Sequence, residues 1–279
     1  MEAFGDSEIV TLELEHRGYP PQAIAVLIDH NFGSMAKDIF VTKAEGFRSR
    51  WEDDARDVTV ADIDLQEAAD TLAHGLEMEQ MLSDSPYSES LGRLRPLLRT
   101  YLKTLPPARP VEHPTFTQNE RDRLAAEFAS SPEASSLDAV VIDDLAWRMI
   151  DFGCDYSDGD PLRWSPVVVE LFMAGWLPRK ALLEVPVEAV PDALRAWVRF
   201  AGRKRGLSEL LIDEAAAAVE QWTPEFKHAI NDPSRFGPSK AMFGAMLDDG
   251  IDITDKAAVD AWVKAFNARP QEERRKVLR

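Results

Sequence analysis

Cysteine is almost absent from this chain of 279 residues, since Cys154 is the single one. One cysteine excludes an internal disulfide and a zinc site built from cysteines. Residues 1–6 lack the basic and then apolar character of a signal peptide. The most apolar stretch, residues 167–177, is far too short to cross a bilayer. We therefore expect a soluble cytoplasmic protein with no membrane partner.

The common catalytic and phosphate-binding motifs are also missing. The sequence contains no G-x-x-x-x-G-K-[ST], G-x-G-x-x-G, G-x-S-x-G or H-E-x-x-H pattern. Its five histidines are scattered and none has the i, i+4 spacing of a helical zinc site: His16, His30, His74, His113 and His228. These absences remove the commonest chemistries and favour a protein that is not an enzyme. The sequence identifies no catalytic residue.

Positive charge is scarce, with 32 basic residues against 49 acidic ones and a formal net charge of −17. The first 113 residues carry −10 of this charge and the remainder carries −7. Such a field repels a phosphate backbone, so nucleic acid binding is not expected except at a local basic patch. The same field favours electrostatically steered association with a basic protein partner.

A proline-rich segment divides the chain. Residues 106–114 contain four prolines, which prevent a helix and stiffen an extended connection. Six of the seven tryptophans follow this segment, and large aromatic side chains contribute much of the burial in a core. We therefore predict an acidic N-terminal helical domain at 1–105, a linker at 106–116, and a larger, Trp-rich C-terminal helical domain at 117–279. Both a hinge and a rigid strut are compatible with the linker.

The punctuation and apolar spacing of the sequence are typical of helices. A hydroxyl residue followed by proline is a common helix start, and it recurs at Ser85–Pro86, Ser131–Pro132, Ser165–Pro166 and Thr223–Pro224. Leu194, Trp197, Val198 and Ala201 follow i, i+3, i+4, i+7 spacing. Residues 21–40 suggest a short helix–turn–helix, although its second helix has one base and one acid, which is poor for reading DNA. We predict an all-α, multihelical fold of about ten to twelve helices with no substantial sheet.

Four segments of the C-terminal part carry a resemblance to known sequences. These are DFGCDYSDGDPLRWSPVVVE at 151–170 with WLPRK at 176–180, LRAWVRF at 194–200, and FNARPQEER at 266–274. Over about 115–279 the chain resembles the helical region of uncharacterised actinobacterial proteins. Some of those proteins also carry a domain of the plasmid-open-reading-frame-three-like family, which would add β-structure that we do not expect here. The resemblance implies no activity and does not extend to 1–105.

The first candidate site is the acidic loop at 151–164, which holds four carboxylates within ten residues. Clustered carboxylates attract hard divalent cations, and the candidate metal ligands are Asp155, Asp158 and Asp160. The EF-hand pattern fails, because alignment on Gly159 leaves Cys154 and Tyr156 at ligand positions. The competing interpretation is an ordinary inter-helix loop in which Arg163, itself a candidate binding residue, neutralises the aspartates.

The second candidate site is a basic strip in which three arginines lie four residues apart. It consists of Arg195, Arg199, Arg203, Lys204 and Arg205. Such a strip could bind a phosphate, RNA or an acidic partner surface. The competing interpretation is that these cations complement the helix macrodipole before Gly206 and pair with the chain's own carboxylates.

The sequence does not establish a biochemical function. The best interpretation is a cytoplasmic helical protein-interaction or regulatory module with an unidentified protein partner. The alternatives are a hydrolase that uses a divalent metal at the Asp151–Asp160 loop, and an RNA or nucleotide binder that uses the Arg195–Arg205 strip. No cofactor is expected other than this possible divalent cation, and the sequence does not indicate an oligomeric state.

Overall fold

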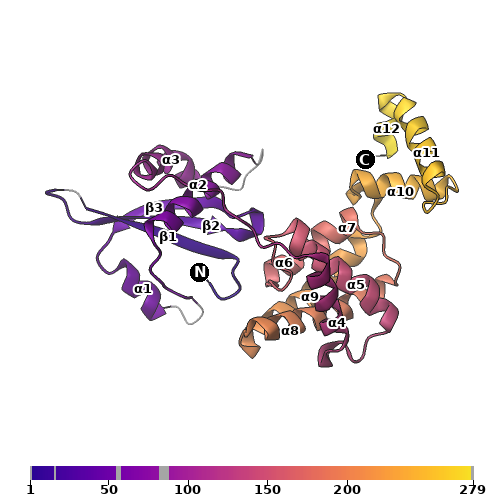
Figure 1. Ribbon diagram of the computed structural model, residues 1–279, viewed down its shortest axis with the longest axis horizontal. Coiled ribbons are helices and arrows are strands. Elements are labelled where there is room, and N and C mark those ends of the chain that lie inside the picture. The colour runs from indigo at the N-terminus through magenta and orange to yellow at the C-terminus, as the bar shows by residue number, and fades with distance from the viewer. Residues whose placement is uncertain (1, 16, 55–57, 82–87, 278–279) are drawn as a thin grey trace. The chain divides into compact units, whose positions relative to one another are not determined.

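The computed structural model describes residues 2–15, 17–54, 58–81 and 88–277 (Figure 1). The chain divides into two compact units. The N-terminal unit comprises Met1–Asn119 together with the inserted loop Gly153–Ser165. The C-terminal unit comprises Glu120–Phe152 and Pro166–Arg279.

The N-terminal unit is a three-stranded antiparallel sheet with helices on both faces. Its strand order is β1-β2-β3, with α2 and α3 over one face and α1 on the other side (Figure 1). The elements are β1 (Ser7–Leu14), β2 (Gln22–Asp29), the 3₁₀ turn η1 (His30–Phe32), β3 (Met35–Lys43), α1 (Phe47–Asp54), α2 (Leu65–Met81) and α3 (Glu89–Leu102).

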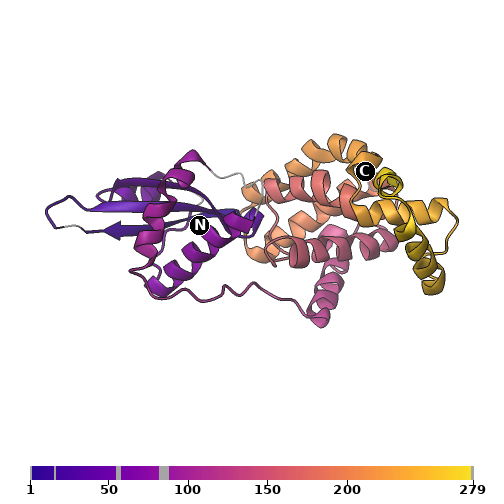
Figure 2. The same ribbon diagram turned by 90° about the horizontal axis from the view of Figure 1, so that it is seen from above.

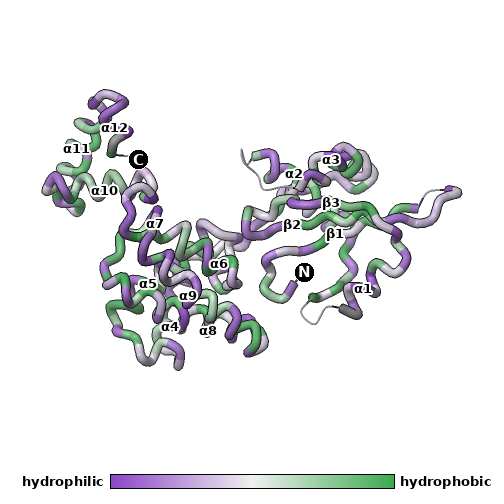
Figure 3. The backbone as a smooth tube through the Cα atoms, turned by 180° about the vertical axis from the view of Figure 1, so that it is seen from behind, coloured by the Kyte–Doolittle hydropathy of each residue, from purple (hydrophilic) through white to green (hydrophobic). Residues whose placement is uncertain are grey.

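This sheet shows that the all-α prediction is wrong, because the fold mixes helices with a β-sheet. The number of helices agrees with the expected ten to twelve. The central strand β2 has no polar residue between Ala23 and Ile28, since both of its faces are covered, and it therefore lacks the alternation that identifies a half-exposed strand. In Figure 3 the strands carry green, hydrophobic stretches that are interrupted by purple, hydrophilic ones.

The suggested helix–turn–helix at 21–40 is the β2–β3 hairpin. Asp29 accepts a hydrogen bond from the Asn31 backbone N–H at 3.0 Å and so caps the turn η1. Gly33 and Ser34 then adopt φ values of 71° and 61°, which reverse the chain into β3. The apolar runs on either side of this turn therefore pair as strands.

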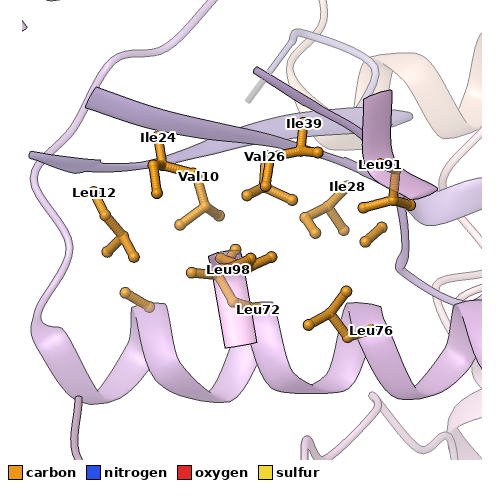
Figure 4. Close-up of a cluster of buried hydrophobic side chains, with 12 residues drawn as sticks. Val10, Leu12, Ile24, Val26, Ile28, Ile39, Leu72, Leu76, Leu91 and Leu98 are labelled. Atoms are coloured by element: carbon orange, nitrogen blue, oxygen red, sulfur yellow. The ribbon is translucent and has the colours of Figure 1, made fainter. Parts of the chain in front are cut away.

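The core of the N-terminal unit lies between one sheet face and the helices α2 and α3. Figure 4 shows aliphatic side chains of the three strands pointing toward leucines of both helices. The cluster consists of Val10, Leu12, Ile24, Val26, Ile28, Ala36, Ile39, Ala68, Leu72, Leu76, Leu91 and Leu98. Burying each large aliphatic side chain contributes about 1.5–3 kcal/mol to folding.

The proline-rich segment is attached to α2. Gln66 donates to the Pro107 carbonyl at 3.0 Å, and the Asp70 carboxylate accepts from both the backbone and the guanidinium of Arg109. The rings of His74 and His113 lie 5.5 Å apart, edge to face. Figure 2 shows the extended course of the chain after α3.

Helices and the loops between them make up the described residues of the C-terminal unit, with no strand among them. Its α-helices are α4 (Gln118–Ala129), α5 (Ala139–Asp151), α6 (Pro166–Glu170), α7 (Leu177–Lys180), α8 (Val190–Arg205), α9 (Glu209–Ala229), α10 (Pro238–Asp248), α11 (Lys256–Ala268) and α12 (Gln271–Val277). Its 3₁₀ turns are η2 (Pro132–Ala134), η5 (Val187–Ala189) and η6 (Pro233–Arg235). The π-helical segment η4 (Leu171–Trp176) also belongs to this unit, whereas η3 (Phe152–Tyr156) begins at Phe152 and continues into the inserted loop of the N-terminal unit.

The helix-start patterns have mixed outcomes. Ser165–Pro166 precedes α6 as predicted, and Ser131 caps the short 3₁₀ turn η2. Thr223–Pro224 is not a start, because it lies inside α9. Ser85–Pro86 lies outside the described residues, as does His16.

Aromatic side chains form the centre of the C-terminal unit. Trp197 is fully buried, and its ring lies 5.0 Å from that of Phe128 and 5.6 Å from that of Phe200. The helices α8 and α9 form a hairpin at Gly206, which has a φ of 71°. A smaller cluster of Met246, Trp262 and Phe266 joins α10 to α11. Across the described ranges, no helix of either unit is both long and apolar enough to span a membrane.

Candidate functional site

An open cleft of about 570 Å³ lies in the N-terminal unit, on the sheet face opposite α2 and α3. Its walls are β1, α1 and the irregular segment 58–63, which leads to α2. This volume falls within the range of roughly 300–1,000 Å³ that is usual for ligand sites. None of the sequence-derived candidate residues lines it.

The walls of the cleft are largely apolar. Ile9 of β1 is paired in register with Leu27 of β2, and both side chains face the cleft. Phe47 of α1 packs against Phe40 of β3 with 5.9 Å between the ring centroids, and Trp51 lies 6.4 Å from Phe47. Trp51 remains 37% exposed, because the adjacent space is open. An apolar group that entered this space would be removed from water.

The rim of the cleft is acidic. Four carboxylates, those of Glu2, Glu8, Glu13 and Asp62, line the cleft together with one cation, Arg48. The Arg48 guanidinium already pairs with Asp62 and with Glu52, the latter at 2.8 Å, and these carboxylates raise the pKa of Arg48. The cleft therefore presents net negative charge to a ligand.

Besides Asp62, which pairs with Arg48, two further rim carboxylates have local partners. Glu2 accepts hydrogen bonds from the backbone N–H groups of Phe4 and Ser7, at 2.8 and 3.3 Å. Glu8 lies 3.6 Å from Nε2 of His30. Within the described ranges, nothing pairs with the Glu13 side chain, which is exposed. Glu13 is thus available to a ligand without loss of an internal contact.

The outer edge of β1 opens onto the same cleft. Ser7 bonds to Glu2 through both its N–H and its C=O, whereas the Asp6 carbonyl accepts from His30 N–H after the end of β2. Backbone groups of alternate residues in an antiparallel edge strand face opposite sides. The N–H and C=O groups of Ile9, Thr11 and Glu13, in register with Ser7, therefore face away from β2. No residue in the described part of the chain bonds to them.

Arg163 is the central residue of a buried polar cluster in the N-terminal unit and is only 3% exposed. Its guanidinium donates to Asp158 at 2.5 Å, to Asp6 at 2.6 Å and to Asn31 at 2.8 Å. Burial raises the pKa of the Asp6 carboxyl, against the opposing effect of Arg163. The arrangement holds the inserted loop and leaves Arg163 no access to a ligand.

The three candidate metal ligands are not brought together into a metal site. Asp158 pairs with Arg163, and Asp160 accepts from the backbone N–H of Leu162 at 2.9 Å. Asp155 is exposed in the π-helical segment η3. Among the described residues, no group of three or more His, Cys, Asp or Glu side chains is arranged to hold a metal ion.

The basic strip pairs with carboxylates of its own unit. Arg195 contacts Asp192 and Glu220, and Arg199 lies 2.6 Å from Asp213. Arg203 pairs with Glu133 of η2, and Lys204 pairs with Glu127 of α4. Arg205 also has an internal interaction. This arrangement corresponds to the competing interpretation of the strip as a set of internal ion pairs.

Sequence reasoning missed the cleft because it missed the sheet. The signal was present in β1, where Val10 and Leu12 alternate with Thr11 and Glu13. The contributions of α1 and of the segment 58–63 come from positions far from β1 in the sequence, and no short-range pattern connects them.

Comparison with known proteins adds no assignment. No protein-family model, no curated protein and no solved structure matches this chain.

Proposed function

We propose that this protein is a protein-interaction module whose N-terminal unit binds a segment of a partner protein in the cleft beside β1. One observation carries the proposal: an apolar cleft lined by Ile9, Leu27 and Trp51 is surrounded by carboxylates. Apolar anchors in such a cleft supply affinity at roughly 25 cal/mol per Å² buried. The acidic rim selects partners with lysine or arginine beside those anchors.

The charge of the whole chain supports the same partner. A net charge of −17 accelerates encounter with a basic segment and repels an acidic one. The partner's cations meet the rim at Glu8 and Glu13, while the interior of the cleft accepts its apolar side chains. The proposal keeps the cytoplasmic location that the near absence of cysteine favours.

The geometry favours neither alternative function. The aspartates of the acidic loop are engaged with Arg163 and with backbone N–H groups, which a metal ion would have to displace. The cations of the basic strip are engaged with carboxylates, which a phosphate would have to displace. A partner that contacts Ile9, Trp51 or Glu13 in the cleft has no internal ion pair of these residues within the described part of the chain to displace.

The test is selection from a library of random peptides displayed on phage. Ile9→Arg places a long cationic side chain in the cleft, and Leu210→Arg makes the same charge change on α9, where Leu210 is 74% exposed. Peptides that combine Lys or Arg with apolar residues should be enriched. They should bind Ile9→Arg at least about tenfold more weakly than the parent chain, a loss of about 1.4 kcal/mol.

The Leu210→Arg variant should bind these peptides like the parent chain, since the substitution lies outside the cleft. Both variants should keep the parent circular dichroism spectrum. Failure to enrich any peptide, or enriched peptides that bind Ile9→Arg as well as the parent, would contradict the proposed function.

A further inference from the structure

The two edges of the N-terminal sheet differ in how they are protected. The β3 edge is covered, because the Lys37 carbonyl accepts from the Ser88 N–H at 2.8 Å and Asp38 accepts from the Ser88 and Ser90 hydroxyls. Edge strands commonly carry such covers, or lysine, proline or a bulge, to prevent pairing with another chain. The bulge of this sheet lies at Leu27/Ile28, between β2 and β3.

Glu2 covers the β1 edge at Ser7, but beyond Ser7 the described residues provide none of these devices. Its sequence, SEIVTLEL, contains no lysine and no proline. The backbone groups of Ile9, Thr11 and Glu13 face away from β2, and the described residues supply no hydrogen bond to them. Three consecutive outward positions thus offer donors and acceptors at the spacing of a β-ladder.

The same three residues line the cleft with their side chains. A strand placed against this edge would therefore form backbone hydrogen bonds with β1 and direct alternate side chains toward Leu27 and Trp51. Recognition of this kind takes affinity from the main chain and specificity from pockets for alternate residues. A docked helix would satisfy its own backbone and leave the β1 groups without partners.

We propose that the partner segment binds as an added β-strand along β1, in an extended conformation that alternates apolar residues with lysine or arginine. This inference rests on the proposed function and specifies the form of the partner. The apolar residues of the segment enter the cleft beside Ile9 and Thr11, and its alternating cations point to the other face of the sheet, the face on which Glu8 lies in alternation with Ile9. Charge complementarity and the uncovered edge select this occupant over a helix, which could use only the apolar walls.

Two synthetic peptides of identical composition serve as probes. One alternates lysine with valine, and the other places the same residues at helical i, i+3, i+4 spacing. The alternating peptide should bind at least about tenfold more tightly. It should also slow hydrogen exchange at the amides of Ile9, Thr11 and Glu13 by at least about tenfold, because strand pairing protects N–H groups.

A matched pair of variants tests the backbone contact. Thr11→Pro removes an N–H that faces away from β2, and proline is tolerated on an edge strand when its nitrogen faces outward. Thr11→Ala removes the side chain and keeps the N–H. The alternating peptide should lose at least about tenfold in affinity for Thr11→Pro and bind Thr11→Ala within about twofold of the parent.

Methylated peptides repeat the test on the unchanged protein. Methyl groups on alternate backbone nitrogens block hydrogen bonds on one side of an extended strand, and shifting them by one residue blocks the other side. One of the two methylated peptides should lose binding and the other should keep it. Equal binding of both would overturn strand addition, even if Thr11→Pro fails to fold.

The outcomes separate this inference from the proposed function. One outcome would overturn strand addition and leave the cleft as a protein-binding site. In that outcome the helical-spacing peptide binds the parent chain, Ile9→Arg abolishes this binding, and Thr11→Pro leaves it unchanged. A second outcome would overturn both the strand addition and the proposed function. In that outcome neither designed peptide binds, and the phage library enriches no peptide whose binding depends on the cleft.

Discussion

The guanidinium of Arg163 donates a hydrogen bond to the carboxylate of Asp6 at 2.6 Å, although 157 positions separate the two residues. Asp6 immediately precedes β1, and Arg163 lies in the inserted loop Gly153–Ser165. The same guanidinium pairs with Asp158 inside that loop. Arg163 therefore fastens the loop to the start of the strand that lines the cleft.

The first prediction concerns this buried pair. Arg163→Met should destabilise the N-terminal unit by about 3–5 kcal/mol, because it leaves the carboxylates of Asp6 and Asp158 without a compensating charge. The measurement is urea unfolding followed by hydrogen exchange of the β2 amides. Arg195→Met is the control, since its exposed pairs contribute about 1 kcal/mol or less. A loss below about 1 kcal/mol in Arg163→Met would show that the cluster does not stabilise the unit.

Local rules predicted those parts of the fold whose signals are local. Ser165 before Pro166 marks the start of α6, and Gly206 ends α8 with the positive φ that a non-glycine residue avoids. The sheet was missed because strand pairing depends on distant partners. The run Ala23–Ile28 is apolar at each position because residues on both faces of β2 are buried, and a helix that packs on this strand, α2, begins well after it in the sequence.

In the candidate site, too, contacts within a short segment were predicted and contacts between distant segments were not. The sequence predicted that Arg163 could neutralise aspartates of its loop, and the contact with Asp158 agrees with that interpretation. It could not predict that Asp6 and Asn31 complete the cluster, since only the fold brings them near. The contributors to the cleft are likewise dispersed from Glu2 to Ile63.

A second prediction is that stability depends on pH through His30. Burial lowers the pKa of His30 below its ordinary 6.5, because the imidazolium is poorly solvated there. The unfolded chain then binds more protons than the folded chain just below pH 6.5, so the free energy of unfolding falls as the pH falls through this region. Urea unfolding between pH 5 and 7.5 should show a smaller decline in His30→Gln than in the parent chain. Identical pH profiles would contradict this role.

A third prediction compares two glycines in helices. A Cβ at Gly75 of α2 would lie 2.9 Å from Cδ1 of Ile28 and 3.1 Å from the Ala36 nitrogen, whereas one at Gly244 of α10 would meet nothing within 4 Å. Gly75→Ala should therefore destabilise the N-terminal unit by about 1–3 kcal/mol through overpacking. Gly244→Ala should stabilise α10 by roughly 0.5–1 kcal/mol through reduced backbone entropy in the unfolded chain.

Thermal and urea unfolding of both glycine variants measure these opposite signs. The helix propensity gained is the same for both alanines, so a difference between them reports the packing of α2 on the sheet. Stabilisation by Gly75→Ala would mean that α2 can move away from Ile28 and Ala36 at little cost.

The fourth prediction concerns a lysine that is almost fully buried. Lys240 of α10 is 6% exposed, donates to the Pro178 carbonyl at 2.9 Å, and places its ammonium 4.2 Å from the centroid of the Phe236 ring. Burial, with a smaller contribution from the charge of Arg148, lowers the pKa of Lys240 to about 8 from 10.5. The folded unit therefore carries the cost of a poorly solvated ammonium at neutral pH.

That cost is removed as the pH rises, because between about pH 8 and 10.5 the unfolded chain binds more protons at this residue than the folded chain does. The Lys240 contribution to the free energy of unfolding should increase by on the order of 3 kcal/mol across this window. Lys240→Met has no titrating group, so the stability of the parent relative to this variant should increase from pH 7.5 to pH 10 in urea unfolding. A constant difference between the two proteins would mean that the ammonium is as well solvated in the folded unit as in the unfolded chain, and that its contacts with Pro178 and Phe236 replace the water it loses.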